Sequence, residues 1–321
     1  MADGTWGEPG RVTAHGNGLW QIDLGFRGRE GVIAAYLLAG ADELALVETG
    51  PTTTLPALLA GIRAAGFEPA ALGRVFVSHI HLDHSGGAGV LLRDHAPEAV
   101  VHVHPLGAPH LTDPARLLAS AGRLYTGRMD DLWGEVAPIP AKRVVAWSDG
   151  DSVETGGRPL TGLYTPGHAA HHVTLWDPFR GVAFTGDVGG VRMAGTGYAV
   201  PPAPPPELDP EAWAGSVERL RGLGARRLFL THGGGFEDVS AHLDQLMPNL
   251  DELRSIVKAA LLAGEDRAAL TERVHAHVAE KLGPVEPGVL ANLEWATPSF
   301  LAAAGLSRLL AKRGEVPAAA A

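Results

Sequence analysis

The sequence predicts an α/β protein with an all-helical C-terminal segment. Over the first 238 residues, short β-like runs alternate with amphipathic helical stretches, an order typical of sheets covered by helices. From residue 239 onward only helical patterns occur. The chain has 321 residues, 45% hydrophobic and 19% charged, which is enough for a large core and an appendage. We therefore expect one unit over residues 1–238 and a helical accessory region over residues 239–321.

Strands and helices alternate in two similar halves of the first unit. Strands are expected at GLWQIDL, GVIAAYLL and ELALVET, followed by a helix over residues 55–65. The strand RVFVSH, the helix GAGVLLRDHA, the strand AVVHVH and a helical segment over residues 114–133 come next. The second half reads as strands at RVVAW, PLTGLYT, HHVTLW and GVAFTG, a helix over residues 210–223, and the strand RRLFLTH.

The C-terminal region carries apolar residues at helical spacing. The stretches SAHLDQLMPNLDELRSIVKAALLAG and AALTERVHAHVAEKLG each place leucine and valine on one face. A last helix is expected at TPSFLAAAGLSRLLAKRG, with Thr297 as its N-cap. Helices with a single apolar face must bury that face against something. We expect this region to wall a pocket or to form a homodimer contact.

Composition narrows the class of protein. The absence of cysteine removes disulfides, thiolate metal ligands and a cysteine nucleophile. The formal charge of −10 is spread along the chain, which argues against nucleic acid as a partner. No apolar run approaches the roughly 20 residues of a membrane helix, and the first residues, MADGTWGEPG, lack a secretory signal pattern. We expect a cytoplasmic protein that acts on a small molecule and not on a membrane.

The stretch VSHIHLDHSGG places unusual chemistry directly after an apolar strand. It holds His79, His81, Asp83 and His84 within six residues, and two glycines close it. Imidazole and carboxylate are ligands that Zn, Mn, Fe and Co accept in a site without cysteine. The alternative is a polar loop without a metal-binding role that happens to be rich in histidine.

Three further stretches each offer one potential ligand at a strand end. His168 follows a strand in YTPGHAAHH, Asp187 follows one in AFTGDVGG, and His232 follows one in LFLTHGGG. Glycines beside each residue let the backbone approach closely. Strand ends are where an α/β scaffold presents its chemistry. These patterns together predict a metal site.

The four motifs, in this order, resemble those of the metallo-β-lactamase-fold hydrolases, over about residues 18–235. The resemblance implies a four-layer αββα sandwich with a two-metal site at one edge. Within the family, the motifs are most similar to those of the glyoxalase II and lactonase-like branch. It implies seven ligands shared between two divalent ions: His79, His81 and His168 for the first ion, Asp83, His84 and His232 for the second, and Asp187 as a bridge. Zinc is the expected metal, and manganese or iron would also suit these ligands.

Other residues are expected to support this site. Glu48 stands in VETG where family members usually read Asp-Thr-Gly, and the resemblance gives that position a role in orienting the metal loop. His172 is expected to support the ligands in the same way. Arg192 and Tyr198, in a long proline- and glycine-rich segment after Asp187, are candidate substrate-binding residues. His110 is a further candidate, at the pocket mouth.

Two adjacent divalent ions lower the pKa of a shared water toward about 7 and polarise a carbonyl or phosphoryl oxygen. We therefore expect a hydrolase in which metal-bound hydroxide attacks a carboxylic ester, thioester or lactone. Asp83 and Asp187 are the expected catalytic carboxylates, and Asp83 can also carry a proton. A phosphodiesterase or ribonuclease of the same fold is the alternative. A non-catalytic descendant that only binds a metal or ligand is the third hypothesis, disfavoured because every ligand position is filled.

Overall fold

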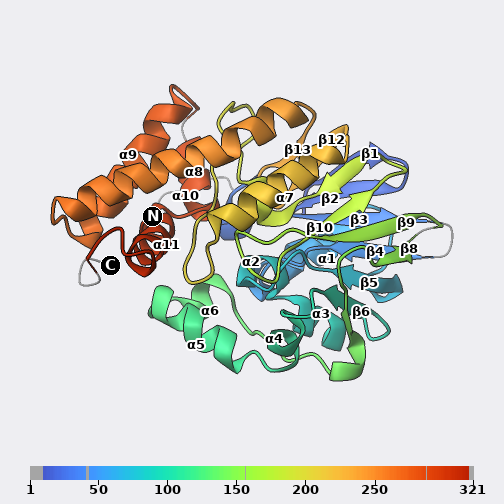
Figure 1. Ribbon diagram of the computed structural model, residues 1–321. Helices are drawn as coiled ribbons and strands as arrows, with labels where there is room; N and C mark the ends of the chain where they lie inside the picture. The colour runs from blue at the N-terminus through green and yellow to red at the C-terminus, as the bar shows by residue number, and fades with distance from the viewer. Residues whose placement is uncertain (1–9, 41–42, 156, 287, 318–321) are drawn as a thin grey trace.

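A computed structural model describes residues 10–40, 43–155, 157–286 and 288–317 of the chain (Figure 1). The stretch at the N-terminus in which we expected no secretory signal lies almost entirely outside these residues. Two mixed sheets stand face to face, with helices on their outer faces (Figure 1). This is the αββα arrangement that the sequence motifs implied.

The first sheet has seven strands in sequential order, and the second has six in the order β13-β12-β11-β10-β9-β8. The parallel pairs are β4–β5, β5–β6 and β6–β7 in the first sheet and β11–β12 in the second. The strands are β1 Val12–Gly16, β2 Leu19–Asp23, β3 Ala34–Ala39, β4 Leu44–Val47, β5 Leu72–Phe76, β6 Val100–Val103, β7 Val144–Ala146, β8 Ser152–Glu154, β9 Pro159–Tyr164, β10 Val173–Asp177, β11 Val182–Phe184, β12 Arg227–Leu230 and β13 Gly234–Phe236.

Helices connect and follow these strands. They are α1 Leu55–Ala64, α2 Leu82–Ser85, α3 Ala88–Asp94, α4 Ala108–Thr112, α5 Ala115–Leu124, α6 Met129–Leu132, α7 Pro210–Gly222, α8 Val239–Leu262, α9 Arg267–Leu282, α10 Val289–Ala296 and α11 Ser299–Lys312. None of the helices within the described residues is both long enough and apolar enough to cross a membrane.

The alternation of side chains along β3 shows how the layers are held together. Ala34, Tyr36 and Leu38 belong to the core between the two sheets. Ala35 and Leu37 belong to the larger core, on the side of the helices. Because successive strand residues point to opposite faces, a strand without charged residues fills both cores at once. The sequence of β3 is therefore continuously apolar, as expected for a strand buried on both faces.

The C-terminal helices pack on the sandwich as a group. α8 lies along α7, and α9 and α11 pack on α8 and on each other (Figure 1). The apolar faces predicted for these helices are buried, with Leu246, Leu253 and Val257 of α8 fully inside. The expected need of each amphipathic helix for a partner is thus met within the chain.

Some local expectations differ from the structure. The single helical segment expected over residues 114–133 is divided into α5 and α6 by a turn in which Gly127 has a φ of +73°. Thr297 is not the cap of α11, because Pro298 takes that position, and the Glu294 side chain accepts the backbone N–H of Ser299. The strands β1, β8 and β13 and the helices α2, α4 and α10 were not expected.

Candidate metal centre and substrate cavity

The first four ligand candidates lie just after β5. The strand predicted at RVFVSH ends at Phe76, so His79 and His81 lie in the loop that follows instead of in the strand. Asp83 and His84 lie in the short helix α2. The loop and helix turn the four side chains to one edge of the sandwich, and all but Asp83 and His81 are fully buried.

The other three candidates come from the second sheet. His168 follows β9, Asp187 follows β11 and His232 follows β12, and all three side chains are buried. The neighbouring strands β11 and β12 run parallel, so the residues after them reach the same edge. Strand ends of both sheets therefore meet at one place, as the motifs predicted.

Two glycines beside these ligands leave no room for a side chain. Gly186 precedes Asp187 with a φ of +48°, and a Cβ there would stand 2.5 Å from the Ser78 hydroxyl oxygen. Gly233 follows His232 with a φ of +110°, and a Cβ there would stand 1.7 Å from a backbone oxygen. Both the left-handed backbone and the close approach require glycine. The glycines of the sequence motifs thus fix where the ligand side chains point.

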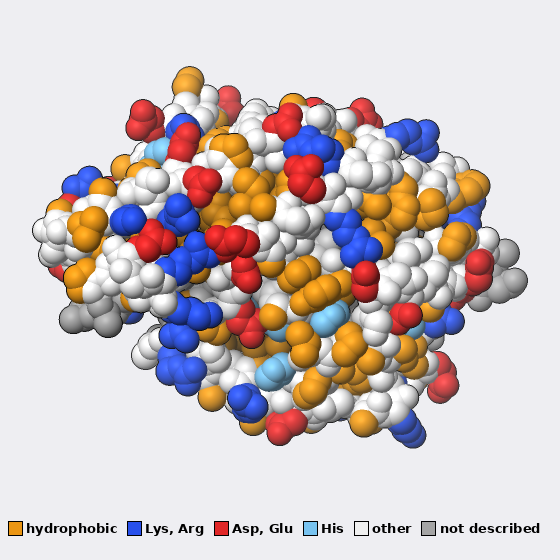
Figure 2. Space-filling model, viewed as in Figure 1, with side chains coloured by type: hydrophobic (Ala, Val, Ile, Leu, Met, Phe, Trp, Pro, Cys, Tyr) orange, Lys and Arg blue, Asp and Glu red, His pale blue; other side chains and the backbone are white. Residues whose placement is uncertain are grey.

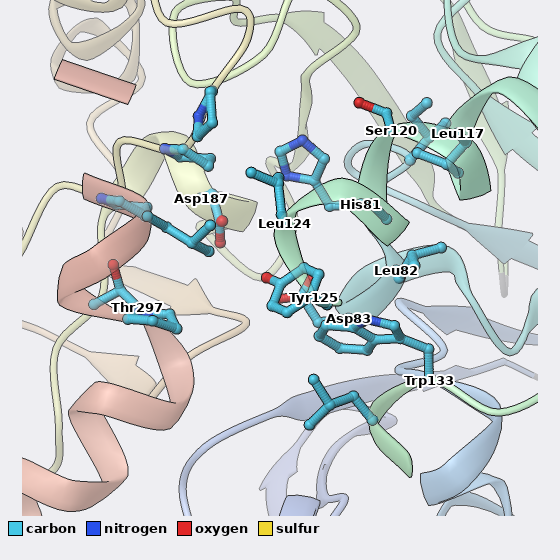
Figure 3. Close-up of a pocket in the computed structure, with 18 of the residues that line it drawn as sticks. His81, Leu82, Asp83, Leu117, Ser120, Leu124, Tyr125, Trp133, Asp187 and Thr297 are labelled. Carbon is cyan, nitrogen blue, oxygen red and sulfur yellow. The ribbon is translucent and has the colours of Figure 1, made fainter. Parts of the chain in front are cut away.

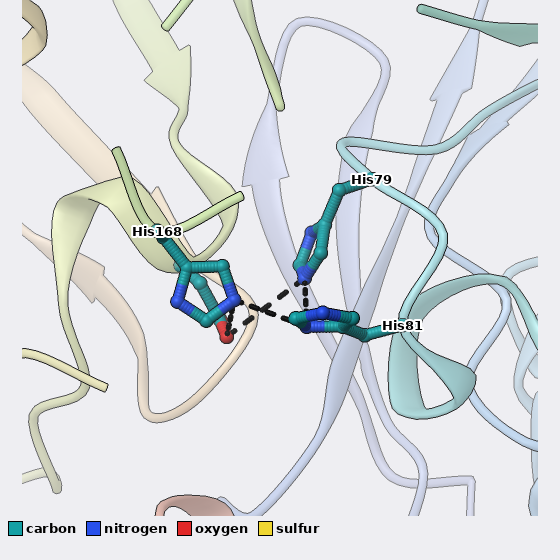
Figure 4. Close-up of side chains that lie close together, drawn as sticks. His79, His81 and His168 are labelled. Atoms are coloured by element: carbon teal, nitrogen blue, oxygen red, sulfur yellow. Dashed lines mark hydrogen bonds and ion pairs between the residues drawn. The ribbon is translucent and has the colours of Figure 1, made fainter. Parts of the chain in front are cut away.

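Three imidazole nitrogens converge in the first cluster (Figure 4). His81 Nδ1 lies 2.9 Å from His79 Nε2 and 3.1 Å from His168 Nε2. Asp187 Oδ2 completes the group, 3.3 Å from His168 Nε2 and 4.0 Å from His79 Nε2. These spacings are close to the separation of about 3.4 Å expected for donors placed ~2.1 Å from one tetrahedral ion.

The second cluster shares Asp187 with the first. Oδ1 of Asp187 lies 3.3 Å from His84 Nε2 and 3.4 Å from His232 Nε2. Asp83 lies on the other side, with Oδ2 3.6 Å from His232 Nε2. Within each cluster one donor atom per residue lies within 4.8 Å of the others. The carboxylate of Asp187 therefore offers one oxygen to each cluster.

Hydrogen bonds from the far side of the rings leave the inward nitrogens free. His168 donates its Nδ1 proton to the Pro202 carbonyl at 2.9 Å, and His232 donates its Nδ1 proton to the Val32 carbonyl at 2.6 Å. A carbonyl only accepts, so each neutral ring must carry its lone pair on the inward Nε2. This arrangement orients an imidazole for binding a metal.

The residues fit a pair of metal ions. His84 Nε2, His232 Nε2 and Asp187 Oδ1 are fully buried, yet none makes a hydrogen bond of good geometry. Burying polar atoms without partners is costly, and a metal ion between them would remove that cost. The donor set of imidazole nitrogen and carboxylate oxygen suits zinc, manganese or iron.

Electrostatics within the site agree with such a role. Burial, followed by the neighbouring imidazoles, holds the pKa of His79 and of His81 well below its usual range, so both rings stay neutral. Burial acts to raise the pKa of Asp187, but three surrounding imidazoles outweigh it and hold that pKa well below the usual range. Neutral His79 and His81 and an ionised Asp187 are the forms that bind metal, whereas His84, whose pKa is raised, must lose its proton when a metal binds.

Glu48 supports the second cluster. Its carboxylate is buried and Oε1 lies 3.2 Å from Nδ1 of His84, and the same side chain reaches the backbone N–H of Ser78 at 3.4 Å. Burial acts to lower the pKa of His84, but the carboxylates of Asp187 and Glu48 outweigh it and raise that pKa. Glu48 itself has a φ of +64°, uncommon for a residue other than glycine. The side chain is therefore held at the site by its backbone as well as by its contacts.

His172 lies behind Asp187. Its Nδ1 is 3.0 Å from the Thr165 hydroxyl oxygen, and its Nε2 accepts the backbone N–H of Val188 at 3.4 Å. His172 thus steadies the turn that carries Asp187, while His168 is oriented by the Pro202 carbonyl. Both ring nitrogens of His172 are engaged by these contacts.

A cavity of about 940 Å³ opens onto the two clusters (Figure 3). His81, Asp83, His168 and Asp187 form its base. Its walls are mainly apolar and come from three separate parts of the chain: α5, α6 and the residues between them, the proline-rich segment at residues 202–206, and the C-terminal helices α10 and α11. The helical tail that the sequence placed beside the site therefore walls it.

Only one of the three residues expected to bind substrate lines this cavity. His110, in α4, is part of its wall. Arg192 instead pairs with Asp238 at 2.8 Å and packs over the ring of Phe236. Tyr198, in the proline- and glycine-rich segment after Asp187, is buried, with an exposed fraction of 7%. A bridge between the backbones of residues 191 and 200 folds this part of the segment away from the cavity, and the prolines after it reach the wall.

Sequence reasoning missed the residue at the centre of the cavity. Tyr125 follows α5, and its ring lies in the middle of the cavity with the hydroxyl on the side of Asp187 (Figure 3). Its ring packs edge-on against Trp133 at 5.1 Å and Phe300 at 6.1 Å. Burial, then the charges of Asp83 and Asp187, raises the pKa of Tyr125, so its O–H remains a donor. The only signal in the sequence was an aromatic residue at the end of an amphipathic segment.

Known proteins resemble this chain in sequence. A metallo-beta-lactamase fold-containing protein of Sulfurisphaera tokodaii is 28% identical over 200 residues, which are 60% of this chain and 73% of that protein. The thioesterase pkgB of Emericella nidulans is 26% identical over 162 residues, half of this chain but 34% of the fungal protein.

Solved structures share the fold. A metallo-beta-lactamase family protein from Thermus thermophilus superposes with a TM-score of 0.63 at 22% identity, covering 88% of this chain and 89% of the other. A beta-lactamase domain protein from Burkholderia ambifaria superposes with a TM-score of 0.64 at 19% identity, covering 96% and 89%. The family model described as the metallo-beta-lactamase superfamily matches residues 28–232, a range that holds all seven ligand candidates. By fold, motifs and site together, this chain belongs to the metallo-beta-lactamase superfamily.

Proposed function

We propose that the protein is a two-metal hydrolase that cleaves a carboxylic ester, thioester or lactone. The observation that carries this proposal is the placing of Asp187, whose two carboxylate oxygens each face one cluster of imidazoles. Divalent ions held there would acidify a shared water and polarise the carbonyl of a substrate. No side-chain nucleophile is then needed, which suits a chain without cysteine.

The residues around the clusters have separate tasks. Tyr125 can donate its O–H to an oxygen on which negative charge develops, because burial and two nearby carboxylates keep the phenol protonated. Asp83 has a side chain that is 23% exposed, on the cavity side, so it can take up a proton and return it to a leaving group. His168 and His232 are held in one orientation by their bonds to backbone carbonyls.

The cavity walls support a substrate with an apolar part. Leu124, Trp133, Trp295 and Phe300 face the same space, from α5 to α11. Such walls bind apolar groups through burial, worth about 25 cal/mol per Å² of apolar surface removed from water. That one relative is named a thioesterase fits the same class of substrate.

Metal analysis is the first test of this proposal. Protein purified without chelator should contain close to two transition-metal ions per chain, and dialysis against chelator should remove both metal and activity. Adding back zinc, manganese or iron separately would identify the ion that restores activity. A metal-free preparation that still hydrolysed a substrate would disprove the metal-dependent mechanism.

A substrate panel is the second test. It should contain aryl esters, lactones, thioesters with neutral thiols, and a phosphodiester, all assayed with the metal-loaded protein. Hydrolysis of one or more carbonyl substrates, with Asp187→Ala inactive, is the expected result. Faster cleavage of the phosphodiester than of every carbonyl compound would replace this proposal with the phosphodiesterase alternative.

A further inference from the structure

Three arginines stand at the mouth of the cavity. Arg116 and Arg123 lie on α5, and Arg128 precedes α6; all three line the cavity and are exposed to solvent. Arg116, Ser120 and Arg123 are spaced i, i+4 and i+7, which puts them on one face of the helix. The two guanidinium groups start from backbone positions about 10 Å apart along the helix axis. Lys and Arg side chains gather over α5 and α6 beside the C-terminal helices (Figure 2).

Arg116 and Arg123 differ from most arginines of the chain in having no acidic partner among the residues that the structure describes. Arg93, for comparison, pairs with both Asp94 and Glu135 on the surface. Neither Arg116 nor Arg123 makes an ion pair or side-chain hydrogen bond with any residue that the structure describes. The chain has a net charge of −10, yet the wall of this one cavity carries two arginines whose positive charge no described acidic partner neutralises.

The acidic residues of the same wall are engaged elsewhere. Glu207 accepts the backbone N–H of Ala170 at 3.1 Å. Glu294 pairs with His275 at 3.0 Å and accepts the backbone N–H of Ser299. Neither carboxylate is paired with the arginines of the mouth, so their positive charge faces the cavity and the solvent.

Arg128 links this charge to the apolar wall. Its guanidinium lies over the ring of Trp295, 5.3 Å from the centroid, and it makes a long ion pair of 3.5 Å with Asp131. Asp131 has a shorter contact, 2.6 Å, with Arg27. Arg128 is therefore only partly neutralised, and the ring beneath it fixes its position.

We propose that Arg116, Arg123 and Arg128 bind an anionic group, phosphate or carboxylate, on the part of the substrate that extends from the reacting carbonyl to the cavity mouth. The nature of the reacting group rests on the function proposed above. The substrate is then an acyl compound with three parts: a carbonyl at the clusters, an apolar portion against the aromatic walls, and an anionic end at the arginines. Guanidinium groups bind phosphate and carboxylate through paired hydrogen bonds, which gives geometric selectivity as well as affinity.

A nucleic acid is a weaker occupant of this site. A phosphate backbone requires an extended basic track, whereas the three arginines are confined to one side of a cavity mouth and the chain is acidic overall. The walls between the arginines and the clusters are apolar and aromatic, which suits an acyl chain better than a ribose-phosphate strand.

The test compares thioesters of one acyl group that differ only in the thiol. The hexanoyl thioester of coenzyme A carries phosphates, that of glutathione carries carboxylates, and that of N-acetylcysteamine has no charge. KM and kcat are measured for each with the metal-loaded wild type and with Arg116→Gln/Arg123→Gln. Arg308→Gln is the matched control, because Arg308 is an exposed arginine of α11 that does not line the cavity.

We expect the double variant to raise KM for at least one anionic thioester by about 10-fold for each arginine that contacts it. The kcat values, and the KM of the neutral thioester, should stay unchanged, and Arg308→Gln should have no effect. Added salt should raise KM for the anionic thioester alone. An effect confined to the coenzyme A compound would identify phosphate as the bound group, and one confined to the glutathione compound would identify carboxylate.

Binding is measured separately from hydrolysis. Desulfo-coenzyme A has the phosphates but neither thiol nor thioester, so its affinity for the metal-loaded protein can be measured by calorimetry even if no thioester is cleaved. Failure to cleave any ester, lactone or thioester would count against the proposed function, whereas desulfo-coenzyme A binding that is lost in the double variant would still support the arginine subsite.

Three results would overturn the subsite: equal KM changes for charged and neutral thioesters, an equal effect of Arg308→Gln, or the absence of any arginine-dependent binding of desulfo-coenzyme A and of any preference for the glutathione thioester. Arginine-dependent binding of a short single-stranded RNA, without binding of either anionic thioester, would assign the arginines to nucleic acid instead.

Discussion

The loops that hold the candidate metal ligands and the helices that wall the cavity are built in different ways. The ligand loops leave the ends of buried strands, and their positions are fixed by backbone contacts such as the close approach at Gly233. The walls come from α5, α6, α10 and α11 and meet through side chains, as where the ring of Tyr125 packs against Trp133 and Phe300. Backbone-fixed loops tolerate little change, whereas walls made by side-chain packing can change their lining one residue at a time.

Because of this difference, we expect the ligand loops to determine the chemistry and the cavity walls to determine which substrates are bound. A substitution among the ligands should remove metal and activity together for every substrate. A substitution in the walls should leave the metal in place and change which substrates are bound, or how fast one of them reacts. Variants of both kinds therefore test whether the ligand loops and the cavity walls have separate tasks.

The largest effect is expected at the residue shared by both clusters. Asp187→Ala removes a carboxylate that faces three imidazole nitrogens within 3.4 Å, so it should abolish activity and lower the metal content. His81→Ala should do the same, because His81 Nδ1 is central to the first cluster. Elemental analysis and turnover of the best substrate measure both outcomes. Wild-type turnover in Asp187→Ala would show that the ligand assignment is wrong; Asp130→Ala, at an exposed aspartate of α6, is the control.

A smaller effect is expected at Glu48, which contacts a ligand instead of a metal. Its carboxylate is 3.2 Å from His84 Nδ1, and loss of such a support typically costs 10–100-fold in activity or metal affinity, so Glu48→Ala should cost about that much. Glu48→Gln keeps an oxygen that can accept from His84 and should cost less. Metal titration and kcat/KM are the measurements. Equal losses in the two variants would mean that charge, and not orientation of His84, is what Glu48 supplies.

The ligand loops were predictable from sequence because their signal is local. His79, His81, Asp83 and His84 lie together in one motif, and each of the other ligand candidates stands beside glycine at the end of an apolar strand. The order of strands and helices indicated an α/β fold, and the motifs implied the two facing sheets. A short strand such as β13 gave no signal, since its three residues show no period.

The cavity walls were not predictable in the same way. Tyr125, Trp133 and Trp295 come together only after the helices have packed, and nothing in the spacing of residues 125 and 295 indicates that they share a wall. The segment after Asp187 was expected to face the substrate through Arg192 and Tyr198. The backbone bridge between residues 191 and 200 instead folds this part of the segment away from the cavity. The bridge joins two irregular stretches, and such a pairing has no sequence pattern from which it could be predicted.

The wall residue with the clearest expected effect is Tyr125. Tyr125→Phe removes the hydroxyl but keeps the ring that packs against Trp133, so stability and metal content should not change. If the hydroxyl donates to the reacting oxygen, kcat should fall by about 10-fold while KM is unchanged. A change in KM alone would make Tyr125 a part of the binding surface. No change in either constant would remove it from the mechanism.

Acid stability should depend on His102, a buried histidine of the sandwich that belongs to neither cluster. His102 of β6 is 2% exposed, stacks on Phe76 at 4.7 Å and lies 3.2 Å from Arg74 Nη1, which in turn pairs with Glu43. Burial, followed by the charge of Arg74, lowers the pKa of His102 to about 4. The unfolded chain, with an ordinary histidine pKa of about 6.5, therefore binds more protons than the folded protein between these two values.

Stability should then fall as the pH drops from about 6.5 to about 4, and the contribution of His102 is at most about 3.4 kcal/mol. This destabilisation is absent at neutral pH, where the His102 ring is neutral in both the folded and the unfolded state. His102→Gln removes the titrating group, so the variant should lose less free energy of unfolding than the wild type over this interval, whatever its stability at pH 7. Urea unfolding at a series of pH values measures the difference. Parallel curves for the two proteins would show that His102 is not responsible for the acid sensitivity.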